Sequence, residues 1–156
     1  MGFVEITAAR PDDDAAPSLL AALDVDLAQR YDSTAEDEAV PLDPTAVAPP
    51  WGGFFLASVD GEAAGCIALR HLEPSVGELV RLFVAPPARG QGVGQALVAA
   101  VENAGRSLRY RTLRLETGLR QPEAIRLYES LGYRQIPRYG RYKDSPLSVC
   151  FQKALR

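Results

Sequence analysis

The chain has few of the residues on which metal sites and disulfide frameworks depend. Among its 156 residues there is one histidine, His71, and there are two cysteines, Cys66 and Cys150. The cysteines are far apart and each lies in an apolar run, which favours two free buried thiols over a disulfide or a metal pair. One histidine leaves little from which to build a zinc site. We therefore expect no metal.

Long hydrophobic runs are also missing. No apolar segment approaches the roughly 18 residues of a transmembrane helix, and residues 1–6 lack the features of a signal peptide or a myristoylation site. Both absences favour a cytoplasmic protein with no membrane partner. A content of 47% hydrophobic and 24% charged residues is ordinary for a chain that buries one core. We therefore expect a single domain over residues 1–156.

The net charge of −3 is unevenly distributed. Residues 12–38 contain nine acidic side chains and one basic side chain, Arg30, whereas the rest of the chain has more basic than acidic groups. Two explanations stay open. The charges lie on solvated helix faces, or an acidic region attracts a cationic ligand and a basic region an anionic one. The arginines are not interleaved with aromatic residues, so we expect no nucleic-acid partner.

Hydrophobic periodicity and turn residues predict alternating strands and helices. The strongest local signal is Asp60-Gly61 between two apolar runs, which predicts a hairpin. Strands are predicted at 3–8, 53–59, 62–70, 77–84, 112–117, 133–136 and 147–155, and helices at 15–31, near 34–40, from 95 to about 105 and at 121–131. This order predicts an α/β (α+β) fold, a mixed sheet with helices on its faces. We expect the last strand to be an exposed edge, which would allow a homodimer.

The segment Arg89-Gly90-Gln91-Gly92-Val93-Gly94 lies between a predicted strand and an apolar helix. The first turn of a helix carries N–H groups without intrahelical partners, and glycines let an anion approach them closely. The pattern matches neither a Walker loop, which ends in Gly-Lys-Ser/Thr, nor the G-x-G-x-x-G dinucleotide fingerprint. It predicts a phosphate site, although the same glycines also suit a tight turn that only joins a strand to a helix.

With a second motif, this segment resembles the GNAT superfamily of acetyl-CoA-dependent N-acetyltransferases. The family's R/Q-x-x-G-x-G/A motif matches residues 89–94, and its A-x-x-x-Y-x-x-x-G-F/Y pattern matches Ala124, Tyr128, Gly132 and Tyr133. The resemblance covers almost the whole chain. It implies the GNAT fold, a mixed, mostly antiparallel sheet of about seven strands with helices on both faces. It also implies transfer of an acetyl group from acetyl-CoA to a primary amine by direct attack in a ternary complex.

The resemblance further implies which residues bind acetyl-CoA (coenzyme A). Backbone amides at the helix start, flanked by Arg89, would hold the pyrophosphate, and the preceding strand would hydrogen-bond the pantetheine arm. The implied cofactor-binding residues are Leu82, Phe83, Val84, Arg89, Gly90, Gln91, Gly92, Val93, Gly94 and Gln95. Gln121 stands where the family usually has an asparagine that caps the helix or contacts the cofactor. We therefore assign Gln121 no cofactor role.

Two residues are implied as catalytic. Tyr128 stands at the position of the family's usual general acid, which protonates the departing thiolate; the alternative is an amphipathic core tyrosine. Strand alternation is expected to place Glu78 on one face with the aliphatic residues Val80, Leu82 and Val84. Burial there would disfavour its charged form and suit a general base that acts directly or through water. The alternative is a strand-end acid in solvent.

The acceptor amine is expected between two loops, residues 31–50 and 137–146. Their charges disagree, because acidic residues would favour a cation whereas arginines would favour a carboxylate. The acids are Asp32, Glu36, Asp37, Glu38 and Asp43, and the arginines are Arg138 and Arg141, with Arg81 nearby. A small amine of zwitterionic or amino-acid-like character fits both. Acetylation of a protein N-terminus or lysine, and a non-catalytic acyl-CoA-binding or sensing module, are the alternatives.

Overall fold

The structure is a computed structural model, and it describes residues 2–156. The strands are β1 (Val4–Ala8), β2 (Gly53–Val59), β3 (Glu62–Glu73), β4 (Val76–Val84), β5 (Thr112–Gly118), β6 (Arg134–Ile136) and β7 (Ser148–Ala154). The helices are α1 (Ala16–Tyr31), α2 (Ala35–Glu38), α3 (Val93–Ser107) and α4 (Pro122–Ser130), with short 3₁₀ helices η1 (Pro86–Ala88) and η2 (Gly140–Tyr142). This order of elements confirms the predicted fold.

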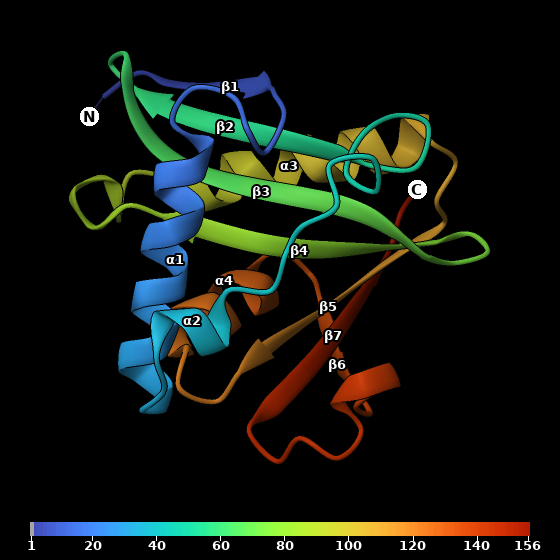
Figure 1. Cartoon of the computed structure of the whole chain (residues 1–156). Helices are drawn as coiled ribbons and strands as arrows, with labels where there is room; N and C mark the ends of the chain where they lie inside the picture. The colour runs from blue at the N-terminus through green and yellow to red at the C-terminus, as the bar shows by residue number, and fades with distance from the viewer. Residues whose placement is uncertain (1) are drawn as a thin grey trace.

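The strands form one seven-stranded sheet in the order β1-β2-β3-β4-β5-β7-β6. Helix α1 lies in front of the sheet and α3 behind it in Figure 1. The predicted hairpin joins β2 to β3. Asp60 and Gly61 at its turn have φ angles of 50° and 84°, the left-handed conformation that a two-residue hairpin turn requires. The sheet and its helices on both faces confirm the fold that the sequence implied.

Each face of the sheet is covered by its own apolar core. On one face Leu97, Val98 and Val101 of α3 pack against the sheet, as their spacing predicted. On the other face Leu19 and Leu23 of α1 pack against a second cluster. Adjacent residues of a strand therefore pack into different cores. This is expected for a strand covered on both sides, because successive side chains point to opposite faces of the sheet.

The pairing of β4 with β5 is parallel and short. Paired residues are Val76 with Thr112, Gly77 with Leu113 and Glu78 with Arg114. Beyond Glu78 the two strands separate, and within residues 2–156 no strand pairs with this edge of β4 from Leu79 to Val84. Every other neighbouring pair in the sheet is antiparallel. The gap between β4 and β5 determines where the site lies.

A β-bulge in β4 corrects one prediction. The register against β3 shifts between Phe83 and Val80, and Arg81, inside the shift, has a φ of 61°. A bulge adds one residue to a strand and reverses the faces of the side chains beyond it. Glu78, Val80, Leu82 and Val84 therefore do not share one face. Val80 packs with the α1 core, whereas Leu82 and Val84 pack with the α3 core.

The position of β7 corrects a second prediction. The last strand is not an edge, because β7 lies between β5 and β6 and pairs with both. The expected route to a homodimer along this strand is therefore wrong. The cysteine prediction is confirmed, since Cys66 and Cys150 are free and buried. None of the helices in residues 2–156 is long and apolar enough to cross a membrane.

Candidate active site

A cavity of about 430 Å³ opens where the C-terminal half of β4 meets the N-termini of α3 and α4. We call it the glycine-loop cavity. Of the ten residues expected to bind a cofactor, only Gln91 does not line it; its side chain donates to the carbonyl of Pro87. The others do line it: Leu82, Phe83, Val84, Arg89, Gly90, Gly92, Val93, Gly94 and Gln95. The end of β4 and the glycine loop therefore line the same cavity.

The glycine loop leaves the start of α3 open to this cavity. Gly92 is the N-cap of α3 and has a φ of 83°, a conformation that residues with a side chain rarely adopt. No side chain of residues 2–156 caps the helix, so first-turn amides such as those of Gly94 and Gln95 have no side-chain partner there. At Gly94 an added Cβ would lie 3.0 Å from Leu127 of α4. Glycine there lets the two helices approach at the bottom of the cavity.

The unpaired edge of β4 forms another wall of the glycine-loop cavity. The Val84 carbonyl accepts a hydrogen bond from Arg89 Nε at 2.9 Å. The Arg89 guanidinium also lies 5.9 Å from the centre of the Phe83 ring. Arg89 is exposed, so its side chain can be displaced from Val84 by a ligand with a donor of its own.

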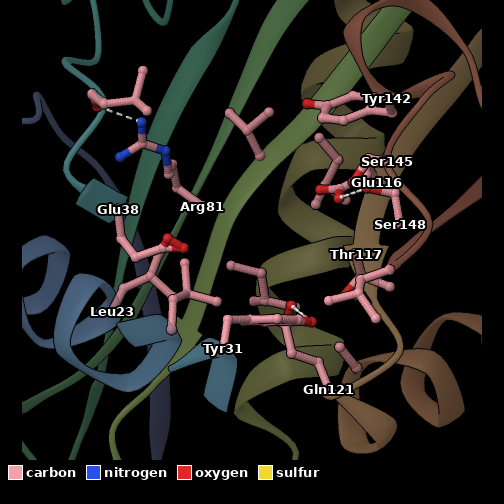
Figure 2. A pocket seen from close by; sticks show the side chains of 18 of the residues that line it. Leu23, Tyr31, Glu38, Arg81, Glu116, Thr117, Gln121, Tyr142, Ser145 and Ser148 are labelled. Carbon is pink, nitrogen blue, oxygen red and sulfur yellow. Dashed lines mark hydrogen bonds between the residues drawn. The ribbon is translucent and has the colours of Figure 1, made fainter. Parts of the chain in front are cut away.

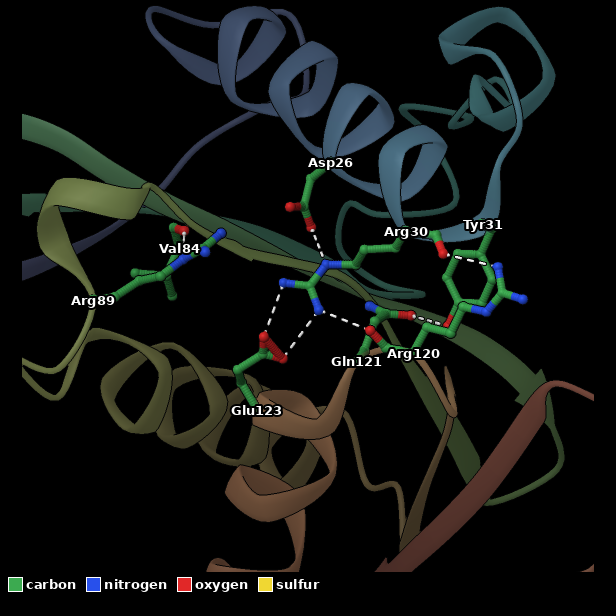
Figure 3. A network of polar contacts seen from close by, with 8 residues as sticks. All are labelled: Asp26, Arg30, Tyr31, Val84, Arg89, Arg120, Gln121 and Glu123. Atoms are coloured by element: carbon green, nitrogen blue, oxygen red, sulfur yellow. Dashed lines mark hydrogen bonds and ion pairs between the residues drawn. The ribbon is translucent and has the colours of Figure 1, made fainter.

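Ionic and hydrogen-bonded contacts join α1 to α4 across the gap, as Figure 3 shows. Arg30 donates to both carboxylate oxygens of Glu123, to Asp26 and to the carbonyl of Arg120. Beside it, the Tyr31 hydroxyl donates to Gln121 Oε1 at 3.1 Å. Arg30 and Glu123 line the glycine-loop cavity, so this bridge forms part of its wall.

A second cavity, of about 410 Å³, adjoins the first, and we call it the Tyr128 cavity (Figure 2). It lies between α1, the β4 bulge, the end of β5 and the loop before β7. The two cavities share four lining residues: Leu23, Leu82, Gln121 and Ala124. A ligand at the glycine loop can therefore extend through the gap between β4 and β5 into the Tyr128 cavity.

Tyr128 projects from α4 into the second cavity. Only 4% of the residue is exposed, and its ring contacts those of Tyr133 and Phe151. Within residues 2–156 its hydroxyl makes no hydrogen bond, whereas the buried hydroxyl of Tyr133 donates to Glu102 at 2.9 Å. Burial, reinforced by the charge of Glu116, raises the pKa of Tyr128 above the ordinary tyrosine value. The hydroxyl therefore stays protonated at neutral pH.

Glu116 near the end of β5 lines the same cavity, and sequence reasoning did not single it out. Burial raises the pKa of its carboxyl above the ordinary value, while a 2.6 Å hydrogen bond from Ser148 Oγ acts in the opposite direction. A carboxyl of this kind exchanges protons closer to neutral pH than an exposed one. The alternation that buries Leu113 and Leu115 was the signal available, because it turns Glu116 to the other face of the strand.

Glu78 is buried, with 2% of the residue exposed, but it does not line the Tyr128 cavity. Its Oε1 accepts a hydrogen bond of 2.8 Å from Arg70 Nε and lies 2.7 Å from Nη2 of the same guanidinium, an ion-pair contact. Its Oε2 accepts a hydrogen bond of 2.6 Å from the Tyr139 hydroxyl. Both oxygens are therefore engaged by donors within the protein. These contacts resemble a structural ion pair more than a base that awaits a substrate proton.

The two predicted acceptor loops both reach the Tyr128 cavity, but few of their charges do. Glu38 and Arg141 line it, together with Arg81. Arg138 does not, since it is exposed and donates to the carbonyl of Ser145. The remaining predicted acids are not among the lining residues either: Asp32, Glu36, Asp37 and Asp43. Of the charged residues that the sequence suggested for the acceptor site, the structure therefore places Glu38, Arg81 and Arg141 at the cavity.

Comparisons with known proteins agree on one family. Residues 20–133 match the family model described as Acetyltransferase (GNAT) family. The chain is 35% identical to an IAA acetyltransferase of Azospirillum brasilense, over 99% of this chain and 100% of that protein. It is 36% identical over 87 residues to an aminoalkylphosphonate N-acetyltransferase of Salmonella typhimurium, which is 53% of this chain and 56% of that protein.

A solved structure agrees with these sequence matches. The crystal structure of a Klebsiella pneumoniae protein assigned to the acyl-CoA N-acyltransferases has a TM-score of 0.82 to this chain. The two sequences are 35% identical, and the match covers 99% of each chain. The likeness therefore includes all the elements that surround the two cavities.

Proposed function

The chain belongs to the acetyltransferase (GNAT) family and is an acyltransferase, and we propose that it acetylates a small primary amine by direct transfer from acetyl-CoA in a ternary complex. One observation carries the proposal. The glycine-loop cavity and the Tyr128 cavity meet at the gap between β4 and β5. A donor in one and an acceptor in the other would meet beside Tyr128 and Glu116. We propose that one domain holds the whole site.

We propose that coenzyme A binds in the glycine-loop cavity. Open amides at the start of α3, with Arg89 beside them, would hold the pyrophosphate, since a helix N-terminus favours anions. The unpaired backbone of β4 near Leu82 and Val84 would hydrogen-bond the amides of the pantetheine arm. When bound, acetyl-CoA supplies the acetyl group and a thiol as leaving group. Gln121 borders both cavities, but we assign it no role in cofactor binding.

Two side chains of the Tyr128 cavity would move the protons. Glu116 takes the proton that the amine nitrogen loses, directly or through water, because burial raises the pKa of its carboxyl above the ordinary value and makes it a better proton acceptor than an exposed glutamate. Tyr128 donates its hydroxyl proton to the sulfur that leaves, since its hydroxyl is protonated and has no partner within residues 2–156. The C–N bond replaces the C–S bond, and the two proton transfers leave a neutral amide and a free thiol.

Glu78 remains the alternative base. The sequence suggested it, but its carboxylate would have to leave Arg70 and Tyr139 before it could take a proton. Among the described residues Glu116 has one side-chain donor, Ser148 Oγ, and it borders the cavity itself. We therefore assign the role of general base to Glu116 and a supporting role to Glu78.

The proposed acceptor is a small amine, in part because the Tyr128 cavity holds about 410 Å³. A relative's name supports this choice, since aminoalkylphosphonates are small amines. The test is a thiol-release assay with acetyl-CoA and a panel of amino acids, aminoalkylphosphonates, polyamines, aminoglycosides and peptides. We expect thiol release to be accompanied by formation of an acetylated small amine. Turnover of peptides alone would indicate a protein acetyltransferase, and acetyl-CoA binding without thiol release would indicate a non-catalytic binding module.

A further inference from the structure

We propose that the acceptor amine also carries an anionic group, a carboxylate or phosphonate, and that Arg81 and Arg141 bind this group. The inference rests on the proposed function, because it names the substrate class for the same site. The sequence suggested acids that would favour a cationic acceptor and arginines that would favour a carboxylate. The structure shows which of them face the cavity and which are already paired.

Three guanidinium groups border the Tyr128 cavity, those of Arg70, Arg81 and Arg141. The charge of Arg70 is neutralised by Glu78, whose Oε1 contacts both Nε and Nη2 of the guanidinium. Within residues 2–156, neither Arg81 nor Arg141 has a carboxylate oxygen within 4.0 Å, the longest separation of an ion pair. The cavity therefore contains two positive charges without a paired anion.

Arg81 is held in place by the backbone. Its φ of 61° marks the bulge, and regular alternation from Val80 would have turned the side chain toward the α3 core instead. Non-glycine residues in this conformation store strain that the surrounding structure must offset. One N–H of the guanidinium donates to the carbonyl of Val40. The bulge therefore directs a charged side chain into the cavity.

The remaining N–H groups of Arg81 have no acceptor within residues 2–156. Burial lowers the pKa of the Arg81 guanidinium, while the charge of Asp24 acts in the opposite direction from beyond ion-pair distance. A desolvated guanidinium without a counter-ion is unfavourable, and a planar fork of donors suits a carboxylate or phosphonate. A ligand anion would supply the missing partner.

Arg141 lies across the cavity on the loop before β7. Its Nη2 donates to the Tyr142 hydroxyl at 3.3 Å, and the guanidinium lies over the Tyr142 ring. Among the acids that border the cavity, Glu116 is our proposed base, and the others are Asp24 and Glu38. An amine with an anionic group would thus place its nitrogen at Glu116 and its anion at the arginines.

The test uses pairs of amines that differ in one anionic group. Each α-amino acid is compared with its amide, and each aminoalkylphosphonate with its neutral diester, by the ratio of kcat/KM for the charged over the neutral member. We expect a ratio of at least about tenfold for one class, because hydrogen bonds to an ionised acceptor are about twice as strong as those to a neutral one. A larger ratio for the amino acids would identify the bound anion as a carboxylate, and a larger ratio for the aminoalkylphosphonates would identify it as a phosphonate.

The variants Arg81→Gln and Arg141→Gln should each reduce this ratio about tenfold. Arg134→Gln is the matched control, because Arg134 is exposed on β6 and lines neither cavity. Calorimetry supplies a readout besides turnover: the N-acetylated acid should bind the wild-type chain at least about tenfold more tightly than the N-acetylated amide. Arg81→Lys should recover part of the preference, because it restores charge without the planar fork.

The outcomes separate the two proposals. Neutral amines acetylated as efficiently as their anionic partners would overturn this inference and leave the acetyltransferase proposal intact. A preference for the anionic member that both arginine variants retain in full would overturn the assignment to Arg81 and Arg141. Absence of thiol release with every amine would overturn the acetyltransferase proposal, and this inference with it.

Discussion

Arg30 of α1 and Glu123 of α4 form a two-pronged ion pair with N–O distances of 3.0 Å in both arms. The residues are 93 positions apart in the sequence. Their pair connects the helix in front of the sheet to the helix beside the gap between β4 and β5 (Figure 3). The bridge thus joins two helices whose residues line the glycine-loop cavity.

The first prediction concerns this bridge. Glu123→Gln should lower the free energy of unfolding by about 0.5–1 kcal/mol, since Glu123 is half exposed and such pairs contribute little more. The KM for acetyl-CoA should rise about two- to fivefold, the same energy expressed as affinity. Thermal unfolding and steady-state kinetics measure the two effects. Glu129→Gln is the control, because Glu129 is exposed on the same helix and forms no ion pair within residues 2–156. Equal effects of both changes would contradict a role for the bridge.

The second prediction tests the general base. Glu116→Gln should lower kcat about 10²–10⁴-fold, the usual contribution of acid–base catalysis. In the wild type, kcat should fall as the pH drops through the raised pKa of Glu116, because protonation removes the base. This acidic limb should lie above about 4.3, the ordinary glutamate value, and the variant should lack it. A pH profile of kcat from each protein gives the answer.

Glu78→Gln provides the contrast to Glu116→Gln. It should lower the free energy of unfolding by about 1.5–3 kcal/mol, because Arg70 would lose a charged hydrogen-bond partner. We expect the acidic limb of kcat to persist in this variant. If instead Glu78→Gln removed the limb and Glu116→Gln kept it, the base would be Glu78.

The third prediction concerns the general acid. Tyr128→Phe should reduce kcat about 100-fold or more, with little loss of stability, because its hydroxyl has no partner within residues 2–156. Tyr133→Phe should do the reverse. It removes the hydrogen bond to buried Glu102, at a cost of about 1.5–3 kcal/mol in unfolding free energy, and leaves kcat near the wild-type value. Similar kinetics for the two variants would count against an acid role for Tyr128.

The fourth prediction separates backbone strain from cofactor binding. Gly92→Ala and Gly61→Ala both place a side chain at a left-handed φ, 83° and 84°, and each should cost about 1–2 kcal/mol of stability. Gly61 lies in the β2–β3 turn with open space around it. Only Gly92→Ala should also raise the KM for acetyl-CoA, because Gly92 lines the glycine-loop cavity. An unchanged KM in Gly92→Ala would argue against this loop as the pyrophosphate site.

Local patterns in the sequence were sufficient to predict the strands and helices and their order along the chain. The Asp60-Gly61 turn formed the expected hairpin, because its two left-handed residues are encoded by adjacent side chains. Pro122 begins α4, and Gly132 follows its end with a φ of 90°. These signals act over a few residues, so they can be recognised without knowledge of the fold.

Errors arose where a contact or a register depends on distant residues. Regular alternation placed Glu78 with Leu82, but the bulge at Arg81 depends on the pairing of β4 with β3. The last strand looked like an edge because nothing local reveals that β6 pairs outside β7. Glu116 was missed because its position becomes informative only when β5 separates from β4 and Ser148 approaches it.

The sequence by itself determined the family, the order of strands and helices, and the glycine loop with Tyr128, since each is carried by a short pattern of residue types. Only the tertiary structure decided that Glu78 pairs with Arg70, that Glu116 borders the cavity, and that a bulge directs Arg81 into it. The physical reason is that charges act through space. Whether a carboxylate is a base or a counter-ion depends on which guanidinium or hydroxyl the fold brings to it.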